Sequence, residues 1–343
     1  MTNGADVSKT WWQRTKDFLK REKYRVTYFL PIIVPSVVIA TFFVFYGRFL
    51  LCHEGGKPCS PLTLAVLKAG VDESNEVRAA SYAASASWTL VGGVHFLTSL
   101  LAVLTAVIVI YQVLQSLETG KRWLLILLAV LFAVDASLLV SWKVSADTSS
   151  PAQLLLASTV AQVQHSINRY NRLFDSMSLT AIISLAFAAC ATLWQPDINE
   201  TPEEKDMVRR VGLLRYVLYV SATLLALSVL RLSATLAWGE SFLPPESGTG
   251  KAVATLVSSI TSSLGAYFTL LLLGMYLPAT MLLRSRARKL AQGETMEDKD
   301  EWLKKRGLAL SFSDYLPRIV ALLGPLLAGP IGELLGRAFG GAA

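Results

Sequence analysis

Residues 122–142 read Arg-Trp-Leu-Leu-Ile-Leu-Leu-Ala-Val-Leu-Phe-Ala-Val-Asp-Ala-Ser-Leu-Leu-Val-Ser-Trp, and this stretch decides the fold. Its length matches the ~20 apolar residues that a helix needs to cross a bilayer, and tryptophans near both ends are typical interfacial anchors. Asp135 breaks the apolar pattern. A charge at the bilayer centre costs at least ~2.5–3.5 kcal/mol, so Asp135 needs a partner, a proton or water.

Two other apolar runs carry an ionisable residue at the same spacing from a tryptophan. Asp135 and Arg231 each lie seven residues before a tryptophan, and His95 lies seven residues after one. If these tryptophans share one membrane face, all three groups lie ~10 Å below it. We therefore predict a buried polar cluster of His95, Asp135 and Arg231. It serves as a structural lock on helix register, an ion or proton path, or a ligand site.

The composition predicts a membrane protein with several spans. Of the 343 residues, 53% are hydrophobic and only 17% are charged. The net charge of +7 would suggest nucleic acid in a soluble protein, but the basic residues lie beside apolar runs. Membrane orientation and anionic lipid explain that placement better, so we expect a lipid bilayer and no nucleic acid as partner. Three cysteines exclude a disulfide-rich scaffold.

The predicted fold class is all-α, with six transmembrane helices arranged as three hairpins. Lysine and arginine gather at the N-terminus and in segments 118–122, 196–215 and 284–289, which the positive-inside rule places in the cytoplasm together with both termini. The tryptophans used above then fall on the outer face. The predicted spans are Val26–Leu50, Trp88–Leu114, Arg122–Trp142, Ser176–Trp194, Leu213–Trp238 and Val253–Leu283.

The chain divides into three parts. Residues 1–27 form a basic amphipathic arm on the cytoplasmic membrane surface, or an arm that binds a partner. Residues 28–283 form the six-helix domain, with extracytoplasmic excursions at 51–88, 143–175 and 239–254. In the first two, helices protrude from the membrane, and one helix is expected to run from Asp72 to Leu117. Residues 284–343 form a cytoplasmic tail.

The tail contains an apolar stretch, 315–338, that is interrupted by prolines and glycines. Arg318 and Glu333 leave about 14 uncharged residues between them, which is short for a span. We interpret the stretch as a helix on the inner surface or an oligomer contact. A seventh span or a re-entrant hairpin is the alternative.

Cys52 and Cys59 flank a tight turn in the first excursion. On an oxidising side of the membrane the pair is expected to form a disulfide. A metal site with the intervening His53 and Glu54 is the alternative, but the spacing fits no common zinc pattern.

The second excursion carries an apolar stripe with alternating spacings of four and three residues, which is the spacing of a coiled-coil seam. The stripe packs on the protruding helix of its own chain or on a neighbouring subunit. Its members are Leu156, Val160, Val163, Ile167, Tyr170 and Phe174.

The outer half of the sixth predicted span is rich in hydroxyl groups. Such residues line water in a pore, or they bond back to their own helix and allow close packing. The candidate pore-lining residues are Ser258, Ser259, Thr261, Ser262, Ser263 and Thr269.

No catalytic motif is present, and three histidines leave little material for metal or haem sites, so we expect no enzyme, no metal and no cofactor. The first functional hypothesis is an oligomeric channel or pore-like protein that passes ions or small solutes, built as a homo-oligomer in a bacterial cytoplasmic (inner) membrane. The alternative is a non-conducting scaffold or sensor subunit. Its extracytoplasmic helices would bind a partner protein and its tail would relay the signal. A transporter lacks the expected paired broken spans.

Overall fold

The computed structural model describes residues 75–115, 161–194, 204–241, 248–290, 303 and 319–332, and these residues form five helices. The four long ones are α4 (Asn75–Gln115), α7 (Ala161–Leu193), α8 (Glu204–Glu240) and α9 (Gly248–Leu290). Each is long and apolar enough to cross a membrane, which confirms the all-α class and supports an integral membrane protein. The fifth, which we call the C-terminal helix, is Ile319–Gly332.

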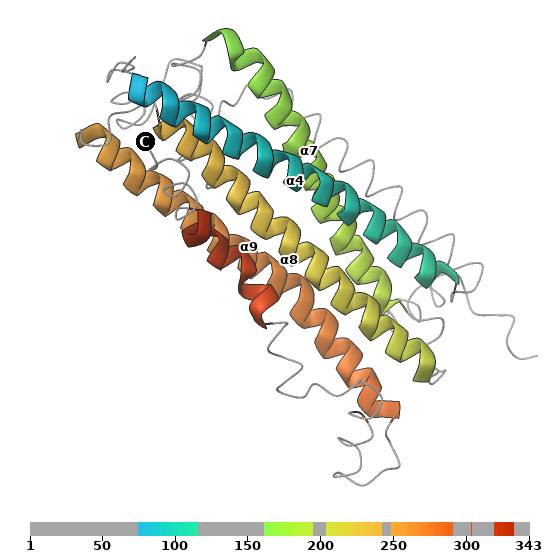
Figure 1. The fold of residues 1–343 in the computed structure, drawn as a ribbon. Coiled ribbons are helices and arrows are strands. Elements are labelled where there is room, and N and C mark those ends of the chain that lie inside the picture. Colours follow the sequence, from blue (N-terminus) through green and yellow to red (C-terminus); the bar gives the residue numbers. More distant parts are fainter. Residues whose placement is uncertain are drawn as a thin grey trace, which may run out of the picture.

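The helices form one elongated bundle (Figure 1). They contain the second, fourth, fifth and sixth predicted spans. The first and third predicted spans, with Asp135, lie outside the described residues, as do the arm 1–27 and the Cys52–Cys59 turn. As predicted, α4 is unbroken, and its 41 residues extend about 60 Å, roughly twice the thickness of a bilayer core.

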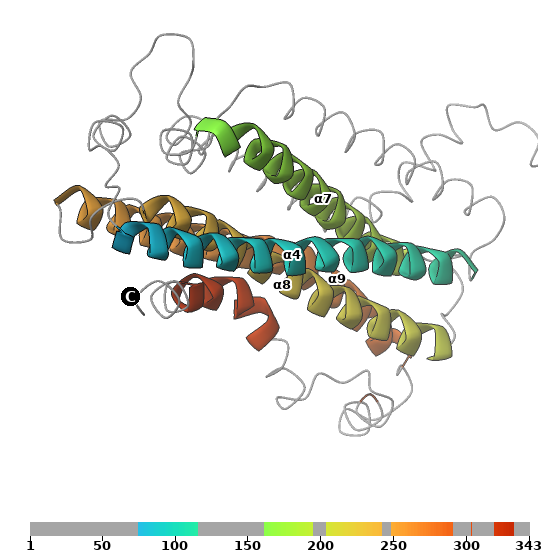
Figure 2. The ribbon, with the colours of Figure 1, turned by 45° about the horizontal axis from the view of Figure 1, so that its top comes forward.

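Contacts at the two ends give the helix directions. Near the middle of α7, Phe174 lies beside Gly92 of α4, and further along both helices Cys190 clusters with Val113. α4 and α7 are therefore parallel. α8 runs the opposite way: Trp238 near its end contacts Trp88 of α4, with ring centroids 5.3 Å apart and planes at 40°. Ser228, earlier on α8, contacts His95, which is later on α4. α9 runs parallel to α4 and α7, as Figure 2 shows.

Small residues let α7 pack closely within the bundle. Alanines 181, 186, 188, 189 and 191 of this helix are all buried, together with the free thiol of Cys190. Such side chains allow helix backbones to approach in a membrane, where lipid is as apolar as leucine and packing drives association. α7 therefore lies against α4, α8 and α9 along its second half.

Two arginines hold the C-terminal end of α7. Arg210 of α8 is 2% exposed, and its Nη1 donates to the carbonyls of Thr192 (3.2 Å) and Trp194. Arg286 of α9 donates to the carbonyl of Leu193 at 2.7 Å. The last carbonyls of a helix have no partner within it and carry partial negative charge, so two cations cap them well. We call this end of the bundle the arginine end, and the opposite end, with Trp88 and Trp238, the tryptophan end.

The C-terminal helix packs against α8 and α9. Ala328 clusters with Val229 and Leu264. A Cβ added to Gly265 would lie 2.5 Å from the carbonyl oxygen of Pro325, so a larger residue there would collide with the C-terminal helix. In both ribbon views this helix lies alongside the first half of α9 (Figures 1 and 2).

Candidate functional site: a buried polar layer

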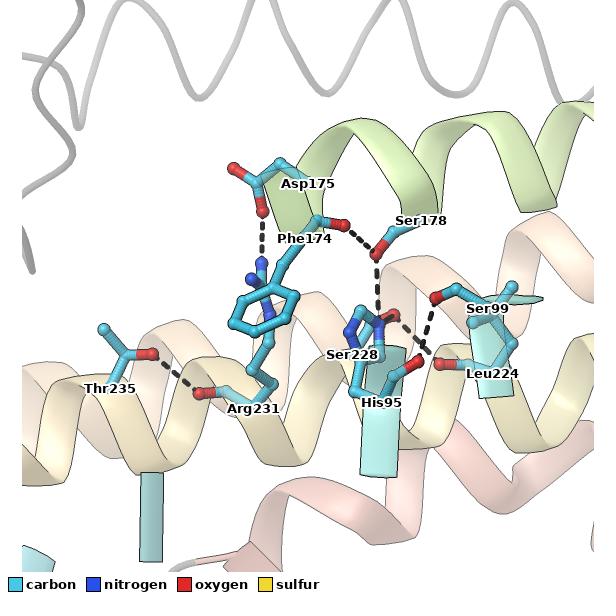
Figure 3. Close-up of polar contacts among 9 residues, drawn as sticks. All are labelled: His95, Ser99, Phe174, Asp175, Ser178, Leu224, Ser228, Arg231 and Thr235. Carbon is cyan, nitrogen blue, oxygen red and sulfur yellow. Dashed lines mark hydrogen bonds and ion pairs between the residues drawn. The ribbon is translucent and has the colours of Figure 1, made fainter. Parts of the chain in front are cut away.

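The site centres on His95, which is fully buried between α4, α7 and α8. Its Nε2 lies 2.9 Å from Oγ of Ser228 on α8 and 3.1 Å from Oγ of Ser178 on α7. Figure 3 shows the three side chains converging from the three helices. With Asp175 and Arg231, described below, they form what we call the polar layer.

The hydrogen-bond pattern fixes the position of the histidine proton. The hydroxyl of Ser178 donates to the carbonyl of Phe174 at 2.7 Å, and that of Ser228 donates to the carbonyl of Leu224 at 2.9 Å. Because each hydroxyl has one proton, both oxygens can only accept from His95. From this network we assign a proton to Nε2. Within the described part of the chain, the buried Nδ1 has no hydrogen-bond partner.

Arg231 and Asp175 form the charged half of the layer. Nη2 of Arg231 on α8 pairs with the Asp175 carboxylate on α7, and the two side chains are 14% and 31% exposed. The guanidinium also lies over the ring of Phe174, 5.6 Å from its centroid. Its Nε and Nη1 are buried without a hydrogen-bond partner among the described residues. The layer thus combines an ion pair with a buried histidine, and three of its polar atoms have no hydrogen-bond partner within the described part of the chain.

The structure brings together two members of the predicted cluster. Ser228, which binds His95, is one helical turn from Arg231 on α8, so both ionisable groups lie in the same layer. Trp88 and Trp238 contact each other, and His95 and Arg231 each lie seven residues from one of these tryptophans. The two ionisable residues therefore lie at the same level of the bundle. The third predicted member lies outside the described residues.

Sequence reasoning missed Asp175 as the partner of Arg231. This residue directly precedes the predicted fourth span and was assigned to the excursion outside the membrane. The available signal was its position next to Phe174, a residue of the apolar stripe. Because the helix of the stripe continues into the fourth span, a residue next to the stripe can lie at the same level as the polar residues of the other helices.

Of the predicted stripe, only the end can be compared with the structure. Phe174 packs on α4 of the same chain, with its ring 5.8 Å from that of Phe96 and in contact with Gly92. This contact agrees with packing inside one chain. The structure places three further members of the stripe on α7 without describing their side chains: Val163, Ile167 and Tyr170. The remaining two, Leu156 and Val160, lie outside the described residues.

The six candidate pore-lining residues of α9 occupy different surroundings. Ser259, Ser262 and Ser263 are exposed, and Ser258 is half-buried. Thr261 is buried with its hydroxyl donating to its own helix, and a Cβ on Gly329 of the C-terminal helix would lie 3.4 Å from its backbone. Thr269 is buried as well. Three of the six therefore lie on an outer surface of the bundle.

The described residues contain no group of three or more histidine, cysteine or acidic side chains that could hold a metal ion. Comparison with protein-family models, with curated proteins and with solved structures found no match to this chain.

The two serines should act as alternative acceptors for His95. Ser178→Ala or Ser228→Ala alone leaves Nε2 one hydroxyl, so each should lower the free energy of unfolding by at most about 1 kcal/mol. The double variant leaves a buried donor unpaired and should cost about 1–3 kcal/mol more than the sum of the singles. Unfolding of the detergent-solubilised protein, followed by tryptophan fluorescence, measures this. Additive effects would show that His95 does not share the two hydroxyls.

Proposed function

We propose that the protein is an oligomeric membrane pore in which the exposed hydroxyl residues of α9 line a path for ions or small solutes. We call the exposed residues Thr255, Ser259, Ser262 and Ser263 the hydroxyl face. From Thr255 to Ala266, every exposed residue of α9 is threonine, serine or alanine. Such a surface suits water or close contact with another helix better than it suits lipid.

The observation that carries this proposal is the contrast with α4. Its exposed side chains include Leu90, Leu97, Leu101, Leu104 and Val107, each more than half exposed. Exposed large apolar residues reappear on α9 only from Leu270 onward. A bundle with one apolar outer face and one hydroxyl outer face is expected where the first contacts lipid or other apolar segments and the second contacts an aqueous path shared between subunits.

The helix directions support the predicted six-span topology. If α4 and α7 both cross the bilayer and run parallel, the chain between them must cross back once. The apolar run 122–142 is long enough for that crossing. In this arrangement the tryptophan end faces outward and the basic arginine end faces the cytoplasm, in agreement with the positive-inside rule. We propose a bacterial cytoplasmic membrane as the location. The proposed function involves no catalysis.

Flux and thiol accessibility test the pore together. In a background whose native cysteines are replaced, Ser262→Cys protein in liposomes should conduct potassium chloride and be blocked by a charged, water-soluble thiol reagent. The matched control is Leu101→Cys on α4, 60% exposed, which should not react because a thiol in hydrocarbon does not form the reactive thiolate. Absence of flux at every voltage, or an unreactive Ser262→Cys, would refute the pore.

The alternative function is a non-conducting scaffold or sensor subunit that binds a partner protein. The polar layer favours it, since Asp175 neutralises Arg231 within one chain and both serines bond to their own helices. Such an arrangement within one chain fixes helix register without any ion. Under this alternative the same liposomes show no flux, and variants of the polar layer change stability alone.

A further inference from the structure

We infer that the C-terminal helix lies within the hydrocarbon core of the bilayer and carries the chain back toward the tryptophan end. The apolar stretch that the sequence assigned to a cytoplasmic tail would then be a seventh membrane-embedded segment. The inference uses the membrane placement of α8 and α9 and is independent of pore activity.

Close backbone contacts hold this helix on α9. Beside the contact of Gly265 with Pro325, a Cβ on Gly329 would lie 3.4 Å from the backbone of Thr261. The contacts run in opposite order along the two helices. Gly329 follows Pro325 by four residues, whereas its partner Thr261 precedes Gly265 by four residues. The C-terminal helix therefore runs antiparallel to α9, in helix contact of the small-residue kind that membranes favour.

Its depth follows from contacts with α8. A Cβ on Gly332 would lie 2.7 Å from Oγ of Ser233, which is five residues before Trp238. At ~1.5 Å per residue, Gly332 lies ~7 Å below the tryptophan level, and Ile319, thirteen residues earlier, lies ~27 Å below it. Both depths fall within the ~30 Å of a hydrocarbon core.

The outer surface of the helix fits the same placement. All of its exposed residues are apolar, so in water they would form a contiguous hydrophobic patch of the kind soluble surfaces avoid. Lipid acyl chains are the partner that such a surface requires at this depth, as on α4. The exposed residues are Ile319, Val320, Leu323, Leu326, Leu327, Pro330 and Ile331.

The direction has a consequence for the two sides of the membrane. α9 ends at the arginine end, and the C-terminal helix begins beside the middle of α9 and runs to Gly332, close to the tryptophan end (Figure 1). The residues that follow Gly332 should therefore emerge on the side of the turn between α8 and α9. The residues that directly follow α9 should be on the opposite side.

Protease protection in sealed membrane vesicles tests this. A protease-cleavable epitope tag is placed after Ala343, at Glu246 between α8 and α9, or at Thr295 beyond α9, in three otherwise identical full-length proteins. We expect the tag after Ala343 to be cleaved or protected together with the tag at Glu246 and opposite to the tag at Thr295. If it behaves like the tag at Thr295, the proposed crossing is wrong.

A substitution pair tests the packing separately. Gly265→Ala should lower the thermal midpoint of unfolding, because its Cβ collides with the backbone at Pro325. Gly93→Ala on α4 is the matched control, with nothing within 4 Å of the added Cβ, and should hold or raise the midpoint. If Gly265→Ala also holds or raises the midpoint, the C-terminal helix does not dock on α9 as inferred.

Discussion

Replacing Arg210 by methionine is expected to lower the free energy of unfolding by about 3–5 kcal/mol, the cost of breaking a buried ion pair from one side. Arg210 is 2% exposed, and its Nε lies 2.5 Å from the Asp206 carboxylate, which is 19% exposed. The substitution would leave that carboxylate without its buried partner and would uncap the carbonyls of Thr192 and Trp194. Denaturant unfolding in detergent, followed by tryptophan fluorescence, measures the loss.

The neighbouring residue provides the control. Arg209 binds the same carboxylate at 2.5 Å, but its side chain is 40% exposed. Exposed ion pairs contribute only about 0–1 kcal/mol, so Arg209→Met should have a small effect. Equal losses for the two variants would mean that the charge of Asp206 matters and the cap on α7 does not.

The second large effect is expected at the polar layer. Arg231→Met should cost about 2–4 kcal/mol, somewhat less than a fully buried pair because Asp175 is 31% exposed. Asp175→Leu alone should cost a similar amount, since it removes the carboxylate bonded to Nη2 of a guanidinium whose Nε and Nη1 already lack a hydrogen-bond partner among the described residues. The double variant should recover most of the loss, because both charges are gone.

A double-mutant cycle makes this quantitative. Coupling between Arg231 and Asp175 of about 1–3 kcal/mol is expected for residues in direct contact. The same cycle with Asp135→Asn distinguishes the predicted cluster from the observed pair. If Arg231 couples to Asp135 and not to Asp175, the sequence-based partner is the correct one and the observed ion pair is incidental.

Hydrophobic length was sufficient to predict the four long helices, because a run of apolar residues at membrane length has few other structures available. The level of His95 and Arg231 could also be predicted, since rise per residue and a tryptophan anchor fix depth. The partner of Arg231 could not be predicted from the sequence. Depth places a residue along a helix, but the choice between carboxylates depends on helix neighbours and rotation, which the sequence does not encode locally.

Two other features illustrate the same limit. Arg210 and Arg286 were interpreted as topology markers, and only the packing of α8 and α9 against α7 shows that they also bind its carbonyls. The C-terminal helix is 14 residues long and rich in proline and glycine, so a length criterion assigned it to a surface. Gly329 instead packs on the backbone of α9 and Gly332 packs on side chains of α8, and both contacts depend on the tertiary fold.

The parallel pairing of α4 and α7 also sets an order of assembly during synthesis. α7, α8 and α9 alternate in direction, so each can pair with its predecessor as soon as it leaves the translocation machinery. α4 cannot pair with α7 until the 45 residues between the two helices and α7 itself have been made. Until then the small residue Gly92 and the buried His95 of α4 lack their partners on α7. We therefore expect misassembly, or recruitment of a chaperone, in the interval between the synthesis of α4 and that of α7.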